Sequence, residues 1–582
     1  MPTKKRSSKR KPVWLDASRA VDSRVRDLME QMTLEEKIRQ MSMFRVSAFL
    51  NRRNRVSSKA VREHFGEHSI GCLQDPRVEP RASAEAVNAV QKYLVERTRL
   101  GIPALVISEC LHGYSCDGAT VFPQAIALGS TWNPELVGRM AEAAAKEARA
   151  VGVAQALAPD LDLARDPRWG RVEETYGEDP WLVSRMGVAY IAAMQGEGEG
   201  YDREHLLCTP KHYAAHGSPE AGVNLAPVPG GLRDLYMTYL PPFKAAVMEA
   251  KAGSIMPAYS EYDGVPASSS KLLLTKVLRE EWGFRGYVFS DYGAIGMLKR
   301  THRIAHSAAE AGKQALEAGM DLEAPSDFGF GDELLALVRK GEVSVDHIDR
   351  AVARILRAKF LAGLFENPYA DPTKAVKVFN NAQHKKLARE IAHESIVLLK
   401  NDRALLPLKS NIGTLAVIGP NADRIQCGDY CRPRPDTVTP LQAIRQMVSK
   451  RTEVRYAEGC PLFERRTTGF KEAVEAARGS EAVVLVVGGT SSTQGGVGWG
   501  SDEGRASCGE GFDRTELGLP GVQQQLVEAV VAEGVPTTVV FVNGRPYSAS
   551  WIAENVPAIV EAWYPGEEGG PALADVLRTF RG

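Results

Sequence analysis

The chain has 582 residues, 44% of them hydrophobic and 25% charged, and its 72 Lys and Arg residues equal its 72 Asp and Glu residues in number. These values are typical of a folded, soluble protein, and a chain of this length usually forms more than one domain. They exclude an intrinsically disordered chain and argue against a nucleic-acid binder with an overall basic excess. No stretch approaches the roughly 20 apolar residues of a membrane span.

The first 30 residues are predicted to be a basic tail and lead-in. The basic cluster from Lys4 to Lys11 is followed only by the short apolar segment Val13–Leu15. A secretory signal would need about 7–15 apolar residues there. Eight cysteines in a chain of this size do not indicate a disulfide framework. We therefore expect a cytoplasmic protein with no membrane partner.

From residue 31 to 366, short apolar runs alternate with helical patterns. Thr33–Glu36 is a capping box that predicts a helix start, and Asn133 followed by Pro134 predicts another. The strand candidates are residues 104–108, 153–158, 206–209, 254–258, 287–290 and 319–322. Such alternation predicts parallel βαβ units, and both an eight-fold barrel and an open doubly wound sheet satisfy it.

A polar residue follows each apolar run of this first part. These residues are Glu109, Asp162, Lys211 with His212, Tyr259, Asp291 and Glu323. In a closed barrel, the carboxyl ends of all the strands open into one mouth, so these side chains would converge there. The pattern therefore favours a functional site over an inert scaffold.

A second α/β unit is predicted over residues 386–582. Ser344 leads an amphipathic helix, after which Pro368 and Pro372 indicate a linker over 367–385. The strands of the second unit are expected near residues 415–418, 482–487, 538–542 and 558–562. A glycine-rich loop over 488–511 lacks the G-K-[ST] of a nucleotide-binding P-loop, so nucleotide binding is disfavoured.

Eight short motifs in fixed order make the sequence resemble glycoside hydrolase family 3, of the β-glucosidase and β-xylosidase type. They are Gly101–Leu105, Glu109–Gly113, Phe122–Ala125, Asp166–Arg171, Lys211–His212, Trp282–Gly286, Ser290–Tyr292 and Glu510–Arg514. The resemblance implies an N-terminal (β/α)8 barrel over 31–366 and an α/β sandwich over 386–582, with the active site between them. Members of the family continue beyond the position of Gly582, so it also implies a shortened sandwich without a fibronectin-III-like module.

Hydrolysis of a β-glycoside with retention requires two carboxyl groups, one nucleophilic and one that donates a proton. The resemblance assigns the nucleophile to Asp291 and the acid/base to Glu510. An aspartate at a strand end also commonly caps a helix, which is the alternative for Asp291. Asp502 and Glu503, in the same glycine-rich loop as Glu510, remain alternatives for the acid/base.

Sugar recognition requires directional donors and acceptors for hydroxyl groups. The residues that the resemblance proposes for it are Glu109, Arg171, Lys211, His212 and Tyr259. Many β-glucosidases of the family carry Asp where this chain has Glu109, whereas β-xylosidase-like members often carry Glu. The longer side chain would fill the space that a hexose CH2OH needs, so Glu109 is our candidate for choosing between glucose and xylose.

We expect neither a cofactor nor a metal ion. His212 and His216 lie four residues apart but lack the glutamate of an H-E-x-x-H motif. The predicted function is an exo-acting, retaining β-glycosidase that acts on terminal glucosyl or xylosyl residues of small glycosides, without a nucleic-acid partner. The alternatives are an inactive sugar-binding fragment and a β-N-acetylglucosaminidase, whose motif is broken over Lys211–Glu220. The oligomeric state is left open, with a homodimer as one option.

Overall fold

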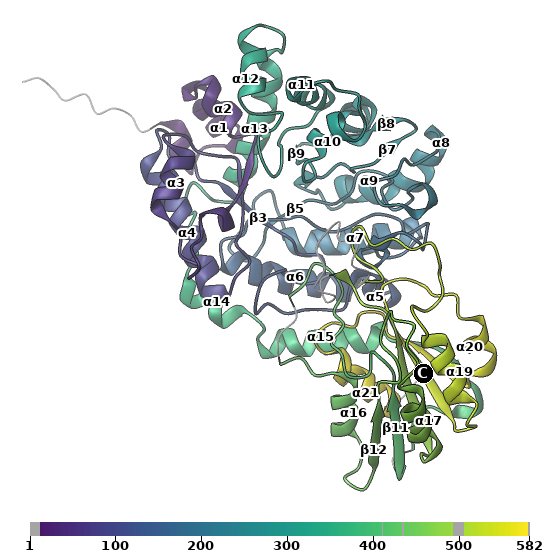
Figure 1. Cartoon of the computed structure of the whole chain (residues 1–582). Coiled ribbons are helices and arrows are strands. Elements are labelled where there is room, and N and C mark those ends of the chain that lie inside the picture. Colours follow the sequence, from purple (N-terminus) through teal and green to yellow (C-terminus); the bar gives the residue numbers. More distant parts are fainter. Residues whose placement is uncertain (1–11, 410, 433–435, 493–505, 580–582) are drawn as a thin grey trace, which may run out of the picture.

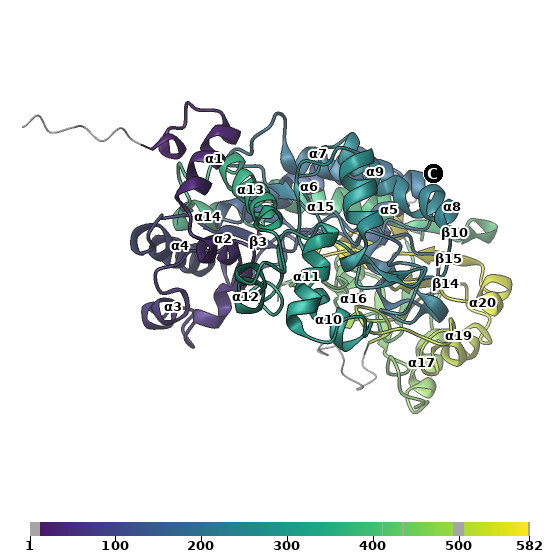
Figure 2. The ribbon, with the colours of Figure 1, turned by 90° about the horizontal axis from the view of Figure 1, so that it is seen from above.

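The computed structural model describes residues 12–409, 411–432, 436–492 and 506–579. In Figure 1 the earlier part of the chain, coloured purple to teal, forms a large body, and the later part, green to yellow, forms a smaller one below it. Figure 2 shows the larger body from above, with α3, α4, α12 and α9 at its periphery. We call the larger body the barrel and the smaller one the sandwich.

Short parallel segments of the larger body close into a ring. Its first five strands pair in sequence order: β1 (Met43–Arg45), β2 (Cys72–Gln74), β3 (Leu105–Ser108), β4 (Gln155–Ala156) and β5 (Leu207–Cys208). The parallel bridge between Tyr213 and Pro257 leads on to β6 (Ser254–Ile255), which pairs with β9 (Tyr287–Val288). Bridges from Phe289 to Leu322 and from Glu323 back to Ser42 complete the ring. This closure is that of the predicted (β/α)8-type barrel and excludes the open sheet.

Helices surround the ring. They are α1 (Val21–Gln31), α2 (Leu34–Arg39), α3 (Ser58–Phe65), α4 (Pro80–Arg97), α5 (Ala125–Ser130), α6 (Pro134–Ala150), α7 (Pro180–Gln195), α8 (Leu232–Asp234), α9 (Leu240–Met248), α10 (Ala294–Arg300), α11 (Ala308–Ala318), α12 (Asp332–Arg339) and α13 (Val345–Leu361). The predicted helix starts are confirmed: Thr33 forms a capping box with Glu36, and the side chains of Asn133 and Ser344 cap α6 and α13. A two-stranded antiparallel hairpin pairs β7 (Glu261–Tyr262) with β8 (Val265–Pro266).

The stretch predicted as a linker is itself helical. It contains α14 (Pro372–Val378) and the first turn of α15 (Ala382–Ser395). The Asp371 side chain accepts from the backbone N–H groups of Thr373 and Lys374, and Pro372 occupies the first helical position, where a missing N–H costs nothing. The proline that suggested an interruption therefore starts a helix.

The smaller body is a three-layer sandwich. Its sheet has the order β10 (Val397–Asn401), β15 (Ala558–Glu561), β14 (Thr537–Val542), β13 (Ala482–Gly488), β11 (Thr414–Ile418) and β12 (Glu453–Ala457), with only β10 antiparallel. Alternate residues of β13 enter different cores, Val484 on one face and Val483 on the other. One core includes residues of α15, α16 (Pro440–Met447) and α21 (Gly569–Thr579), and the other includes residues of α17 (Phe470–Arg478), α19 (Gln523–Val531) and α20 (Ser550–Asn555).

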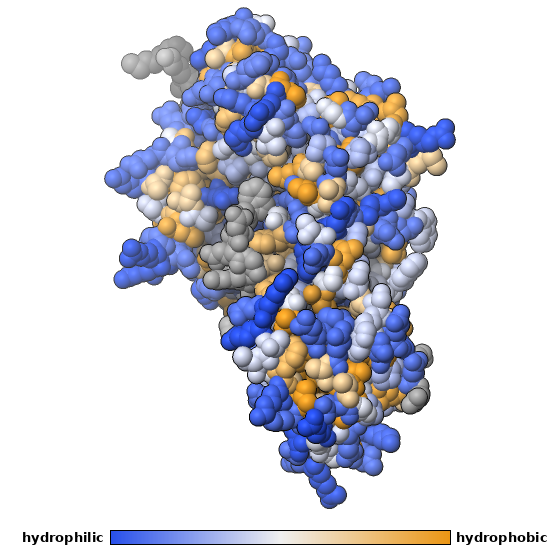
Figure 3. All heavy atoms as spheres, turned by 45° about the vertical axis from the view of Figure 1, so that its right-hand side comes forward, coloured by the Kyte–Doolittle hydropathy of each residue, from blue (hydrophilic) through white to orange (hydrophobic). Residues whose placement is uncertain are grey.

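Cysteine burial and surface hydropathy are both those of a packed protein. All eight cysteines are buried thiols. Figure 3 shows hydrophilic and hydrophobic residues interspersed over one face of the molecule, with hydrophobic atoms in small patches. Among the helices of the described residues, none has both the length and the apolar character needed to cross a bilayer.

Candidate active site

A cavity of about 340 Å³ lies at the mouth of the barrel. Its lining residues are Arg45, Gln74, Arg77, Glu109, Arg171, Lys211, His212, Met256, Tyr259, Asp291, Tyr292, Tyr430 and Glu510. Every residue that the sequence predicted to bind or transform the substrate belongs to this set. Tyr430 and Glu510 come from the later part of the chain, so both bodies contribute to one cavity.

Strand geometry explains why the barrel residues meet. Glu109 directly follows β3, Lys211 and His212 come shortly after β5, and Asp291 comes shortly after β9. The carboxyl ends of the parallel segments open at the same end of the ring, so side chains that follow them share one mouth.

The expected convergence fails for Glu323. Its Oε2 accepts hydrogen bonds from the backbone N–H groups of Gly329, at 2.8 Å, and Phe330, at 2.9 Å. The carboxylate thus holds the turn of its own loop, and Glu323 does not belong to the cavity wall. A polar residue at a strand end can serve its own loop as well as a site.

Arg171 is the central cation of the site. Its side chain is 1% exposed and forms a two-pronged ion pair with Glu174, at 2.8 and 2.9 Å. It also reaches Glu510 Oε1 at 3.3 Å and His212 Nε2 at 3.1 Å. One guanidinium therefore contacts both the predicted acid/base and a predicted sugar-binding residue, and a planar fork of five donors is suited to that task.

A second buried ion pair joins two of the predicted sugar-binding residues. Lys211 Nζ lies 2.9 Å from Glu109 Oε2, and both side chains are less than a tenth exposed. The ring of Tyr430 covers this ammonium group, with its centroid 4.9 Å from Nζ. The pair offers a fixed donor and a fixed acceptor to a sugar hydroxyl in a largely dry site.

Asp291 occupies a buried position with an unused oxygen. Its Oδ1 accepts the backbone N–H of Tyr292 at 2.7 Å, whereas Oδ2 has no hydrogen-bond partner among the described residues. Burial raises the pKa of Asp291 to about 6; the charge of Glu510 adds to that effect and the charges of Arg171 and Lys211 oppose it. His212 Nε2 is 3.6 Å from the free oxygen. A carboxylate oxygen aimed at a cavity without a protein partner is available to an incoming atom.

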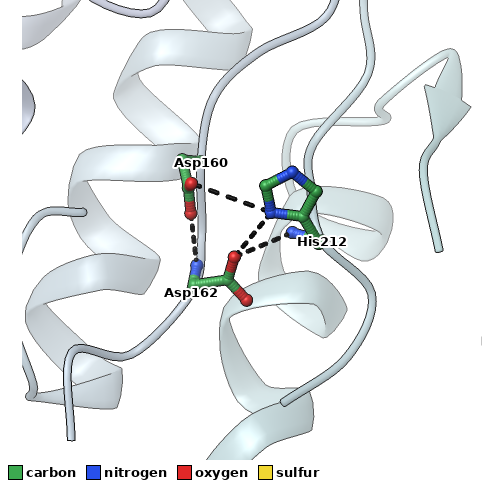
Figure 4. Close-up of side chains that lie close together, drawn as sticks. All are labelled: Asp160, Asp162 and His212. Atoms are coloured by element: carbon green, nitrogen blue, oxygen red, sulfur yellow. Dashed lines mark hydrogen bonds and ion pairs between the residues drawn. The ribbon is translucent and has the colours of Figure 1, made fainter. Parts of the chain in front are cut away.

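His212 is held from behind by two aspartates, as Figure 4 shows. Its Nδ1 lies 2.7 Å from Asp162 Oδ2 and 3.8 Å from Asp160 Oδ2. Because Arg171 can only donate, Nε2 must accept, and Nδ1 therefore carries the proton that bonds Asp162. Burial lowers the pKa of His212 well below its usual value, so the ring is neutral.

The same three side chains are of the kinds that bind metal ions, and their nearest ligand atoms lie within 4.8 Å of one another. The Nδ1 proton already occupies the space between the ring and Asp162, while Asp160 Oδ1 accepts the backbone N–H of Asp162 at 2.8 Å. Asp160 Oδ1 and Asp162 Oδ2 are therefore bonded, whereas Asp160 Oδ2 and Asp162 Oδ1 have no hydrogen-bond partner among the described residues. A carboxylate behind an imidazole fixes its orientation and tautomer. We therefore interpret the cluster as the support of His212.

Backbone contacts to the barrel hold the loop that carries Glu510. Asp513 accepts the N–H groups of Gly170, at 2.7 Å, and Asn224, at 2.6 Å. The N–H of Gly509 donates to the carbonyl of Gly170 at 2.8 Å. Glu510 is thus presented by the sandwich but positioned against barrel backbone.

The segment that carries Tyr430 is also bound to the barrel. The Asp429 carbonyl lies 2.7 Å from His112 Nε2, and the Asp429 N–H donates to Glu173 Oε2 at 3.0 Å. The other oxygen of Glu173 accepts the hydroxyl of Ser491 at 2.8 Å. Burial raises the pKa of Glu173 to about 7. One buried barrel carboxyl therefore contacts two different loops of the sandwich.

Some of the site was not predicted from the sequence. Tyr430 donates its hydroxyl to Glu510 Oε2 at 2.7 Å from a loop without any periodic pattern. Arg45 and Gln74 end two strands for which the sequence analysis named no candidate. The sequence analysis gave six strand candidates for an eight-stranded barrel, and none of them lies before residue 104. This shortage of two strands could have indicated β1 and β2. Asp502 and Glu503, the alternative acid/base residues, lie outside the described residues.

A larger groove, of about 780 Å³, lies on the outside of the barrel. It is lined mainly by Trp181, Met237, Trp282 and neighbouring residues of α7 and α9, and its Arg185 and Glu249 are paired with each other at 2.8 Å. It does not hold the predicted nucleophile and acid/base. We therefore assign the chemistry to the smaller cavity.

Comparisons with known proteins place both bodies in one protein family. The family model described as the glycosyl hydrolase family 3 N-terminal domain matches residues 33–358, and the model of the C-terminal domain matches 396–579. A β-xylosidase of Formosa agariphila is 42% identical over 82% of this chain and 67% of its own length. A periplasmic β-glucosidase of Salmonella typhimurium is 34% identical over 96% of this chain and 72% of its own. The solved structure of a β-glucosidase from Erythrobacter marinus superposes with a TM-score of 0.90 at 36% identity, covering 97% of this chain and 77% of that one.

Proposed function

The chain belongs to glycosyl hydrolase family 3, and we propose that this glycosidase removes single β-linked glucosyl or xylosyl residues from non-reducing ends with retention of configuration. The observation that carries the proposal is that Asp291 and Glu510, supplied by the two bodies, line one cavity. Arg171 and His212 connect them through contacts of 3.1 to 3.6 Å. Retaining glycosidases keep their two carboxyl groups about 5–5.5 Å apart. The charge of Glu510 contributes to the raised pKa of Asp291, which supports a close approach of these two carboxyl groups.

In the first step, Asp291 Oδ2 attacks the anomeric carbon of the bound sugar. The bond from that carbon to the leaving oxygen breaks while Glu510 gives its proton to that oxygen, which leaves a glycosyl ester on Asp291. In the second step Glu510 takes a proton from water, the water oxygen bonds to the anomeric carbon, and the ester bond breaks. The carboxylate of Asp291 is restored and Glu510 is protonated again.

The residues predicted to recognise the substrate hold the sugar. The Lys211–Glu109 pair and the His212 ring present a donor, an acceptor and a fixed imidazole to the hydroxyl groups. The charge of Arg171 stabilises the ionised form of Asp291, and the same guanidinium group contacts Glu510. Tyr259 stands next to Asp291, and burial followed by the charge of Asp291 raises the pKa of Tyr259 well above its usual value, so its hydroxyl stays a donor.

The test is a trapping experiment with a substrate panel. Dinitrophenyl 2-deoxy-2-fluoro-β-glucoside and β-xyloside should inactivate the protein and label the peptide that contains Asp291, and Asp291→Asn should abolish both labelling and turnover. Label on another carboxyl would overturn the assignment of the nucleophile. A folded protein that releases nitrophenol from neither the β-glucoside nor the β-xyloside would favour the sugar-binding alternative, and release only from the N-acetyl-β-glucosaminide would favour the other enzyme.

A further inference from the structure

One wall of the cavity carries cationic and amide groups that the proposed hydrolysis does not use. Arg45 ends β1 and Gln74 ends β2, and these two residues are direct partners in the parallel register of the two strands. Arg77 follows three positions after Gln74, and all three line the cavity. Two guanidinium groups and one carboxamide therefore face the bound sugar from neighbouring strand ends.

Arg171 and Lys211 already form close ion pairs with carboxylates, whereas Arg45 and Arg77 have no close carboxylate partner among the described residues. Arg171 is paired with Glu174, and Lys211 is paired with Glu109. The nearest carboxylate oxygen to Arg77 is that of Asp75, 3.8 Å from Nε, and the buried Nε has no hydrogen-bond partner among the described residues.

Arg45 also lacks an ion-pair partner among the described residues. Its guanidinium stands over the ring of Tyr292, 5.5 Å from the centroid, and in the described part of the chain it forms no ion pair. It is exposed at the cavity rim. The side-chain amide of Gln74, although buried, forms no hydrogen bond to a described residue. This wall therefore presents hydrogen-bond donors that have no hydrogen-bond partner in the described part of the chain.

A neutral sugar does not explain this wall. A sugar hydroxyl donates one hydrogen bond and accepts up to two, but it brings no negative charge. A partly buried cation without a close counter-charge is costly to maintain. Guanidinium groups bind carboxylates and sulfate-type anions through paired, charge-assisted hydrogen bonds. Asp75 is the counter-charge of Arg77, but its Oδ1 stays 3.8 Å from Nε, while its Oδ2 accepts from the hydroxyl of Tyr114 and from the backbone N–H of Arg77. Arg77 therefore lacks a close, two-pronged carboxylate partner.

We propose that Arg45, Gln74 and Arg77 form a binding site for an anionic group, a carboxylate or a sulfate ester, carried by the glycoside in the cavity. The proposal rests on the proposed function, because it names a class of substrate for the same site. The anionic group has two sources: the sugar whose bond is cleaved, as in a uronic acid, or the group to which that sugar is linked. Both sources place a negative charge against the same two arginines.

Two matched substrate pairs separate the sources. The first pair is 4-nitrophenyl β-glucuronide and 4-nitrophenyl β-glucoside, which differ at the carbon outside the sugar ring. The second is 4-carboxyphenyl β-xyloside and its neutral analogue 4-carbamoylphenyl β-xyloside, which differ only in the leaving group. Binding of each compound to the Asp291→Asn protein is measured by calorimetry, and kcat/KM is measured with the unmodified protein.

We expect the anionic member of at least one pair to bind better than its neutral partner. Arg45→Gln and Arg77→Gln should each reduce that preference about tenfold or more, the worth of one lost bond to a charged group. Arg77→Lys should retain part of it, and Arg52→Gln, which removes an exposed arginine outside the cavity, should leave it unchanged. Arg45→Gln remains informative if the Arg77 variants fold poorly, because Arg45 is exposed and forms no ion pair with a described residue.

Equal binding within both pairs, or a preference that both Arg45→Gln and Arg77→Gln leave intact, would overturn the proposal. Failure of the proposed function looks different: no compound is then turned over, while the calorimetric preference persists. A glucuronide preference assigns the anion to the cleaved sugar, and a carboxyphenyl preference assigns it to the neighbouring group.

Discussion

The hydroxyl of Tyr430 provides a test of the acid/base assignment with a single-atom change. It donates to Glu510 Oε2 at 2.7 Å, while Arg171 reaches the other oxygen at 3.3 Å. Burial, followed by the charge of Glu510, raises the pKa of Tyr430 well above its usual value, so the phenol stays protonated and acts as the donor. Tyr430→Phe removes this bond but keeps the ring that covers Lys211.

The expected loss of activity follows from the hydrogen bond that is removed. A hydrogen bond to a charged group is worth about 1.5–3 kcal/mol, and about 1.4 kcal/mol corresponds to a factor of ten in rate. The Tyr430 hydroxyl holds the Glu510 carboxyl in place in the cavity. For a substrate that needs a proton on its leaving oxygen, kcat/KM of the variant should therefore fall about ten- to a hundredfold.

The assay compares two leaving groups at one pH. A phenyl β-glycoside needs a proton on its leaving oxygen and should show the loss, whereas a dinitrophenyl β-glycoside needs none and should not. Tyr236→Phe is the matched control, because Tyr236 donates to Glu281 at 3.0 Å outside the cavity. Equal kcat/KM of Tyr430→Phe and the unmodified protein for the phenyl β-glycoside would refute the role of this bond and weaken the assignment of Glu510.

Three further outcomes are expected. The acid limb of kcat/KM should lie near pH 6, because burial raises the pKa of Asp291 to about 6 and only the ionised carboxylate attacks; a limb near the ordinary aspartate value of about 4 would contradict this. Glu109→Asp should raise the ratio of glucoside to xyloside turnover about tenfold, since one methylene is removed next to the sugar, and an unchanged ratio in nitrophenyl assays would count against it. Burial raises the pKa of Glu561 to about 8, so the folded state binds this proton more tightly than the unfolded one and the free energy of unfolding should fall, by about 3–5 kcal/mol, as pH rises from about 4.5 to 8. Urea unfolding of Glu561→Gln at both pH values should show that much less dependence, and an identical dependence in both proteins would refute the reasoning.

The sequence predicted the helices and strands whose signals lie within their own residues. Helix starts at Thr33, Asn133 and Ser344 carry their own caps, and the central strands of the sandwich are continuous apolar runs such as Ala482–Gly488. Edge strands were missed: β12 (Glu453–Ala457) is largely half-buried, and its mixed polar and apolar residues do not stand out.

Prediction of the site worked where a side chain directly follows a strand, and it failed where tertiary contact places the residue. Asp291 and Lys211 follow apolar runs, and a motif marked Glu510. Tyr430 reaches the cavity only because Asp429 is bound by His112 and Glu173 of the barrel, which lie more than 250 positions away in the chain. Glu323 has the same local signal as Asp291 but serves its own loop. Local pattern alone could not separate these two outcomes.

The Glu510 and Tyr430 loops of the sandwich are both attached to the barrel, so catalysis depends on the contact surface between the two bodies. If the barrel and the sandwich were produced as separate polypeptides, neither would hold both carboxyl groups. Turnover on mixing would then rise with the concentration of each piece and saturate at equal stoichiometry, as for a two-subunit enzyme. Substitutions at Glu173 or Asp513 would raise the concentration needed for half-saturation before they changed the rate of the assembled pair.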